Sequence, residues 1–125
     1  MAQIIDLQTF TDKRGNLTVI EKVIPFEIKR IFYIYGVDES VRGNHRHKKT
    51  IQAAVSLQGT CRICVDNNIG KKEYILNSPE NCLIINPEDW HYMDLFSPDC
   101  ILMVLSSEFY SPDDYIFEPY KNIVK

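Results

Sequence analysis

The sequence lacks the features that mark several large protein classes. No apolar run approaches the ~20 residues that a membrane-spanning helix needs. The N-terminal residues show no basic region followed by an apolar stretch and a cleavage site, so we expect a cytosolic location and no membrane partner. Basic residues number 14 against 17 acidic ones, and the net charge of −3 argues against a nucleic-acid partner.

Cysteine is scarce, and the four cysteines form no convincing zinc or redox motif. Cys61 and Cys64 make a CxxC, but they lie in a stretch with the pattern of a β-strand. Residues three apart in a strand point to opposite faces, no helical pattern follows, and no second CxxC completes a zinc site. We therefore expect reduced cysteines that serve in packing.

Long helical patterns are also missing, and short β-type runs separated by turn signals make up most of the chain. Only the segment near 112–120 indicates a turn of helix. With 125 residues, the chain is expected to form one domain over residues 1–125, an all-β sandwich or barrel. The predicted strands are 3–7, 16–21, 30–35, 45–47, 51–58, 60–66, 72–76, 82–85, 91–96 and 100–106.

The predicted strand at 101–105 is apolar at every position. Such a strand is expected to be covered on both faces. In a chain of this size, the second covered face indicates a homodimer.

Two closely spaced histidines are the strongest chemical signal. His45 and His47 are two residues apart on a predicted strand, so they share a face, while Arg46 points the opposite way. Two buried imidazoles carry ring nitrogens that must find partners, which makes them poor core filler. Two non-catalytic interpretations of the histidines are also open: a chance pair on an exposed strand, and a structural pair held by hydrogen bonds.

The residues that follow the pair have the spacing of the first cupin signature. After His47 come four residues, then Gln52, then six residues, then Gly59. Pro87 and His91 supply the Pro and His of the second signature at an altered interval. The chain thus resembles a cupin, a small RmlC-like jelly-roll β-barrel. Gln52 stands where a metal ligand carboxylate is usual, which weakens the case for a metal, although imidazoles alone could still hold a divalent ion. The histidines are then free for acid–base work. We expect no metal and no other cofactor.

Nearly the whole chain resembles the sugar 3,4-ketoisomerase family. The matching segments are 12–17, 28–34, 42–48, 87–93, 96–97, 104–107, 110 and 114–116. One departure is Arg46, which stands between the histidines where family members often have alanine. Because that side chain faces away from the barrel interior, we expect little effect on the chemistry.

The resemblance implies a metal-independent isomerisation of dTDP-4-keto-6-deoxy-D-glucose to a dTDP-3-keto-6-deoxyhexose. A base removes the C3 proton, an enediolate forms, and a proton returns at C4. The product would serve the biosynthesis of 3-amino-3,6-dideoxy sugars of surface glycans such as O-antigen or S-layer glycans. The family also implies a homodimer that exchanges an N-terminal strand.

Transfer of family roles, residue by residue, gives a set of candidate site residues. The catalytic candidates are His45 as the base, His47 as a second proton-transfer group, and Tyr33, placed on a neighbouring strand. The candidates for substrate binding are Arg14, Arg42, Gln52 and His91. Arg42 would clamp the pyrophosphate. Arg14 together with His91 resembles the members that form the galacto product.

Other interpretations of these residues stay open at this stage. Tyr33 can be a core aromatic, Arg42 a solvated turn residue, and Arg14 and His91 scaffold. The cupin signature alone also allows a metal-dependent oxygenase, a related sugar epimerase, or a sugar-binding cupin without catalysis.

Overall fold

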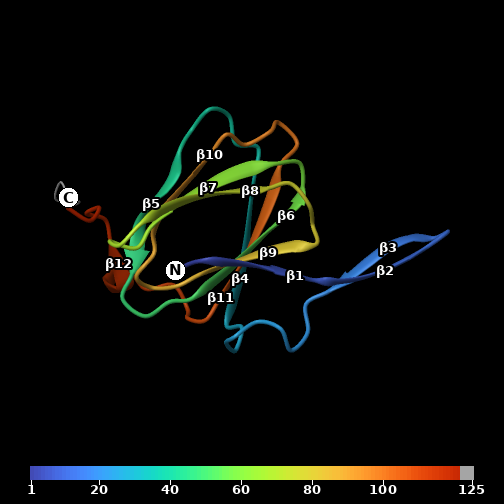
Figure 1. Cartoon of the computed structure of the whole chain (residues 1–125), viewed down its shortest axis with the longest axis horizontal. Coiled ribbons are helices and arrows are strands. Elements are labelled where there is room, and N and C mark those ends of the chain that lie inside the picture. The colour runs from blue at the N-terminus through green and yellow to red at the C-terminus, as the bar shows by residue number, and fades with distance from the viewer. Residues whose placement is uncertain (122–125) are drawn as a thin grey trace.

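Two five-stranded antiparallel sheets face each other in the computed structural model, which describes residues 1–121 (Figure 1). The first sheet has the order β1-β9-β6-β11-β4 and the second the order β12-β5-β10-β7-β8. A separate hairpin of β2 and β3 projects from one end of the sandwich (Figure 1). The first sheet contains β1 (Gln3–Asp6), β4 (Arg30–Tyr35), β6 (Gln52–Gln58), β9 (Asn81–Ile85) and β11 (Ile101–Ser106). The others are β2 (Gln8–Asp12), β3 (Gly15–Val19), β5 (Arg42–His47), β7 (Cys61–Asp66), β8 (Lys71–Leu76), β10 (Trp90–Asp94) and β12 (Tyr115–Ile116), with a 3₁₀ turn, η1 (Pro112–Asp114).

The main core lies between the two sheets. Ile63 of β7 packs in one cluster with Ala54 of β6 and with Leu102 and Val104 of β11. A second cluster covers the outer face of the first sheet, where residues of 20–26 pack on Val55 and its neighbours. Burial of these apolar side chains is the main favourable contribution to the fold.

The predicted all-β jelly roll of cupin type is confirmed, and the two sheets form a sandwich rather than a closed barrel. Ten predicted strands correspond to observed strands, with differences of a few residues at their ends. The prediction missed β2, which is polar except for Phe10 and pairs only with β3, and β12, which has two residues. The turn of helix expected near 112–120 is η1.

Strand β11 is covered on both faces, as its apolar sequence predicts. Leu102 and Val104 face the main core, whereas Leu105 belongs to the outer cluster. Residues of 20–26 in the same chain cover this outer face, so its coverage does not require the second subunit that the sequence suggested. The predicted opposite directions of the CxxC side chains are confirmed, because Cys61 is buried in the main core, whereas Cys64 faces the other way and is only half-buried. Among residues 1–121, no helix has the length and apolar character of a membrane span.

Candidate active site

Three histidines meet on the inner face of the second sheet. His45 and His47 belong to β5, and His91 lies directly opposite His45 on the neighbouring strand β10. The ring centroids of His45 and His47 are 5.0 Å apart, as are those of His45 and His91. Tyr115 of β12 closes the group, with its ring 4.7 Å from both His45 and His47. The strand alternation predicted for His45 and His47 is therefore confirmed.

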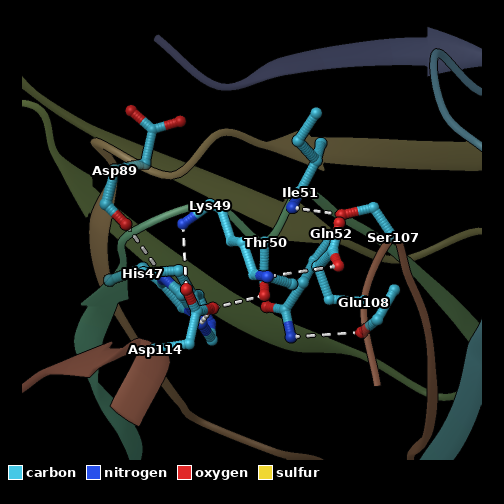
Figure 2. A network of polar contacts seen from close by, with 11 residues as sticks. His47, Lys49, Thr50, Ile51, Gln52, Asp89, Ser107, Glu108 and Asp114 are labelled. Atoms are coloured by element: carbon cyan, nitrogen blue, oxygen red, sulfur yellow. Dashed lines mark hydrogen bonds and ion pairs between the residues drawn. The ribbon is translucent and has the colours of Figure 1, made fainter. Parts of the chain in front are cut away.

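A buried carboxylate holds His47. The Nδ1 atom of His47 is 3.0 Å from Oδ2 of Asp114, and the two side chains are 3% and 6% exposed. Asp114 also accepts hydrogen bonds from the hydroxyl of Thr50 and, at 2.9 Å, from the backbone N–H of Lys49 (Figure 2). With this carboxylate at Nδ1, the imidazole carries its proton there and keeps the lone pair on Nε2.

The other two histidines are oriented in the same sense by backbone carbonyls. His45 Nδ1 donates to the carbonyl of Gly43 at 3.1 Å, and His91 Nδ1 donates to that of Asp89 at 3.0 Å. In each ring Nε2 is thus the nitrogen with a free lone pair. His45 is half-buried, whereas His47 and His91 are buried, so His45 is the most accessible of the three.

The surroundings keep these imidazoles neutral. Burial, reinforced by the neighbouring His47, lowers the pKa of His45 from 6.5 to about 4. Burial lowers the pKa of His91 to about 3 and also lowers the pKa of His47, although Asp114 opposes the change at His47. Burial alone would raise the pKa of Asp114, but the hydrogen bonds from Thr50, Lys49 and His47 outweigh it and lower that pKa. A neutral imidazole beside an ionised carboxylate is a group that can accept a proton.

Several polar atoms of this region are buried without a hydrogen-bond partner in the described chain. They are Nε2 of His47, Nε2 of His91 and Oε1 of Gln52. Gln52 shares the inner face of β6 with Ala54, and its Nε2 lies 3.5 Å from Oγ of Ser106. Buried polar groups normally find partners, so this concentration of unsatisfied atoms indicates a place that binds a polar ligand.

A β-bulge brings Arg42 to the same face as the histidines. The β5–β10 register pairs His91 with His45, Tyr92 with Gly43 and Met93 with Arg42, so Asn44 is an extra residue. Both Gly43 and Asn44 have positive φ, and a Cβ at Gly43 would lie 3.1 Å from the carbonyl oxygen of His91. Because Arg42 is opposite the inward-facing Met93, it lies on the inner face, at the exposed start of β5.

The expected position of Tyr33 is wrong. Tyr33 lies on β4, which is in the first sheet and does not pair with β5. Phe32 and Ile34 occupy the inner face of β4, so strand alternation turns Tyr33 outward, where it is 64% exposed beside Tyr35. From Ile31 to Tyr35 the strand has apolar or aromatic residues on both faces, so its sequence alone did not reveal which residues point inward.

Arg14 also lies apart from the histidines of its own chain. It sits in the turn of the projecting β2–β3 hairpin, where its guanidinium pairs with Asp12 at 2.6 Å and its side chain is 85% exposed. The structure therefore places His45, His47, His91 and Arg42 on the inner face of the second sheet and Gln52 on the inner face of the first, and it separates Tyr33 and Arg14 from them.

Sequence reasoning assigned no role to Asp114, Thr50 or Arg30. Asp114 follows Pro112 and Asp113, so locally it looks like an acidic residue in the first turn of a helix. Arg30 begins β4 on the face of Phe32, and its charge helps to lower the pKa of His47, after the larger effect of burial. Alternation along β4 places Arg30 on the same face as Phe32, so Arg30 could be found once the inward-facing residues of that strand are known.

A surface groove of about 660 Å³ lies elsewhere, on the outer face of the second sheet. Its lining includes Cys64, Trp90 and Tyr92. Trp90 and Tyr92 flank His91 on β10 and therefore point away from the histidines. Orphaned polar atoms and neutral imidazoles make the inner cluster, rather than this groove, the candidate active site.

Comparison with known proteins agrees with this fold. The TDP-4-oxo-6-deoxy-alpha-D-glucose-3,4-oxoisomerase of Aneurinibacillus thermoaerophilus is 43% identical over 126 residues, covering 98% of this chain and 90% of the relative. WlaRA, a TDP-fucose-3,4-ketoisomerase from Campylobacter jejuni, superposes with a TM-score of 0.87 at 38% identity, covering 94% of this chain and 89% of that one. A mutant of the 3,4-ketoisomerase QdtA from Thermoanaerobacterium thermosaccharolyticum, in complex with TDP-4-keto-6-deoxyglucose, gives 0.90 at 40% identity and covers 94% and 87%.

The family model described as FdtA: WxcM-like, C-terminal, matches residues 1–125. The match covers the whole sequence, including the segments that contribute the three histidines and Asp114. The chain belongs to this family, whose relatives above are sugar 3,4-ketoisomerases.

Proposed function

We propose that this chain is an isomerase that converts TDP-4-keto-6-deoxyglucose to a TDP-3-keto-6-deoxyhexose. The observation that carries the proposal is the group of three neutral imidazoles, one held by a buried carboxylate, in a fold shared with 3,4-ketoisomerases. The substrate follows from the relatives, one of which acts on this keto sugar by name and another of which binds it.

The reaction is a proton transfer between adjacent carbons. The C4 carbonyl acidifies the proton on C3, and a neutral imidazole removes it to leave an enediolate. The same proton, or one from a neighbouring group, is delivered to C4, and the O3 proton moves to O4, which leaves the ketone at C3. A positioned acid–base group contributes typically about 10²–10⁴-fold to such a transfer.

His45 is the proposed base. It is the most accessible of the three histidines, its Nδ1 is engaged by the carbonyl of Gly43, and a lowered pKa keeps its Nε2 unprotonated at neutral pH. His47, with Asp114 behind it, is the second proton-transfer group. Asp114 acts through His47 by fixing its tautomer and is a positioning residue.

Gln52, His91 and Arg42 are the proposed substrate contacts within the chain. The unsatisfied Oε1 of Gln52 and Nε2 of His91 can each accept a hydrogen bond from a sugar hydroxyl. Arg42 stands at the exposed end of the same face, where a guanidinium can bind the diphosphate with two parallel hydrogen bonds.

A homodimer is the proposed assembly. The β2–β3 hairpin leaves the sandwich with Phe10 and Leu17 directly opposite each other and more than half exposed. The outer face of β4 also presents Ile31, Tyr33 and Tyr35, each more than half exposed. Two such apolar regions on one small chain support an association between copies. In that assembly, Arg14 at the hairpin turn is proposed to reach the site of the partner subunit.

The galacto configuration at C4 is the proposed outcome of reprotonation. It rests on the combination of Arg14 and His91, which the family resemblance associates with galacto products. The product would then supply a 3-amino-3,6-dideoxygalactose for a surface glycan such as an O-antigen or an S-layer glycan. Four free thiols suit a reducing compartment, which supports a cytoplasmic location.

The test is incubation of the purified protein with TDP-4-keto-6-deoxyglucose, followed by NMR of the sugar signals. We expect loss of the C4 ketone and appearance of a C3 ketone, and an unchanged spectrum contradicts the function. Trapping the product with a 3-aminotransferase then gives the H3–H4 coupling. A small coupling supports the galacto product, and a large trans-diaxial coupling contradicts it while leaving the isomerase function intact.

A further inference from the structure

Arg30 lies on the inner face of the first sheet, within a row of polar side chains. It is paired with Ser106 of β11, and Ser106 is paired in turn with Gln52 of β6. Directly opposite residues of neighbouring strands share a face. The row formed by Arg30, Ser106 and Gln52 therefore crosses the sheet on the side that faces the histidines, and it includes the unsatisfied Oε1 of Gln52.

Aromatic rings rather than carboxylates hold the Arg30 guanidinium. Its Cζ lies 4.5 Å from the ring centroid of Phe32 and 5.3 Å from that of Tyr110. Within residues 1–121, no carboxylate forms an ion pair with it, although Arg14 and Arg62 both have such partners. A half-buried guanidinium without an anionic partner is oriented and still has its hydrogen-bond donors to offer.

The charge of Arg30 acts on the histidine cluster. Burial is the largest cause that lowers the pKa of His47, and the positive charge of Arg30 lowers that pKa further. Asp114 has the opposite effect and raises it. The groups around His47 are Asp114, Arg30, the phenol ring of Tyr115 and the rings of His45 and His91. Both of these histidines are neutral at neutral pH. An anion that forms beside these rings therefore meets a permanent positive charge at Arg30.

We propose that Arg30 is a further catalytic residue, whose guanidinium neutralises the enediolate formed during proton transfer between C3 and C4. This inference rests on the proposed function. When the base takes the C3 proton, the electron pair of the C–H bond moves into the C3–C4 double bond, and the carbonyl pair moves onto O4. Arg30 donates hydrogen bonds to that oxygen without giving up a proton, and the charge disappears when C4 is protonated and the O3 proton has moved to O4.

The test compares Arg30→Ala with Arg46→Ala. Arg46 is a matched control, since its guanidinium also lies 4.5 Å from an aromatic ring, that of Tyr120, but it points away from the histidines. For Arg30→Ala we expect kcat to fall about 10²–10³-fold, the usual loss when one oxyanion donor is removed. TDP alone should bind as it does to the unchanged protein, and added methylguanidine should restore part of kcat. Arg46→Ala should behave like the unchanged protein.

Several outcomes would overturn the assignment. Weaker binding of TDP, measured by calorimetry and parallel to the loss of kcat, would make Arg30 a phosphate contact. An undiminished kcat would remove it from the chemistry. If circular dichroism shows that Arg30→Ala is unfolded, Arg30→Lys is tested instead. We then expect an intermediate loss of kcat and unchanged binding of TDP. A normal kcat in Arg30→Lys would contradict the assignment. An unchanged protein that leaves the sugar untouched would refute the isomerase function itself, and the inference with it.

Discussion

His47 and Asp114 are 67 residues apart in the sequence, yet the imidazole Nδ1 and the carboxylate Oδ2 lie 3.0 Å apart in a buried contact. In Asp114→Asn the amide oxygen can still accept from Lys49, which leaves the NH₂ group facing His47. The imidazole then carries its proton on Nε2 and can no longer accept one there. We expect kcat to fall about 10²-fold or more.

The control for this change is Asp113→Asn, which alters the exposed neighbouring carboxylate and should leave kcat unchanged. Nitrogen-15 NMR of the imidazole reports the tautomer directly. Full activity in Asp114→Asn, or an unchanged tautomer, would show that the carboxylate does not position His47.

Replacement of the proposed base separates the two histidines of β5. His45→Asn keeps a hydrogen-bonding side chain but cannot accept the C3 proton, so turnover should be nearly abolished with the fold intact. His47→Asn should slow the reaction less completely. Exchange of the C3 proton with deuterium in D₂O measures the first step, and near-normal exchange in His45→Asn would eliminate it as the base.

The acidic limb of the pH profile should lie well below the usual range of histidine. His45 accepts a proton only while neutral, and burial has lowered its pKa to about 4. The value of kcat/KM should therefore stay level as the pH falls from 8 to about 5 and decline as it passes through about 4. Steady-state kinetics with circular dichroism at each pH separates titration from unfolding. An apparent pKa near 6.5 would disagree with this environment for the base.

Catalysis should need no divalent metal. The amide of Gln52 occupies the position where the cupin signature usually has a carboxylate ligand, and a neutral amide oxygen binds such cations more weakly. Activity is therefore expected to survive prolonged dialysis against EDTA. A loss that zinc, manganese or iron salts reverse would indicate a metal-dependent cupin instead.

The protein should be a dimer in solution, with a mass twice the 14.6 kDa of the chain. Light scattering after gel filtration measures this mass. The double substitution Phe10→Ser and Leu17→Ser removes the exposed apolar pair of the hairpin and should shift the mass to that of a monomer. Lys13→Ser, in the turn of the same hairpin, is the control and should remain dimeric. A monomer of the unchanged protein at micromolar concentration would refute the assembly.

Mixing variants tests the proposed reach of Arg14. If each site combines His45 of one chain with Arg14 of the partner, Arg14→Ala and His45→Asn dimers should each make little galacto product. After the subunits are exchanged, half of the dimers carry one intact site, so about a quarter of the normal rate should return. No recovery would mean that both residues serve the site of one chain, or that Arg14 serves none.

Local patterns predicted much of this architecture. The spacing of His45, His47 and Gln52 is a property of one strand and the loop after it, and strand alternation determines its faces. The β4 sequence was ambiguous, since Phe32 and Tyr33 are both aromatic and either could face the core. Asp114 reaches His47 only through the fold of the chain, and no local spacing connects the two residues. The inner site was thus predictable where its residues are near in sequence.

The extra residue at Asn44 gives β5 two phases of alternation along one strand. Before the bulge, the even-numbered Arg42 faces inward, and after it the odd-numbered His45 and His47 do. The chain can therefore vary the residue that meets the charged end of a ligand without shifting the residues that handle its protons. In evolutionary terms, one inserted residue makes substrate recognition and chemistry separately adjustable on the same strand.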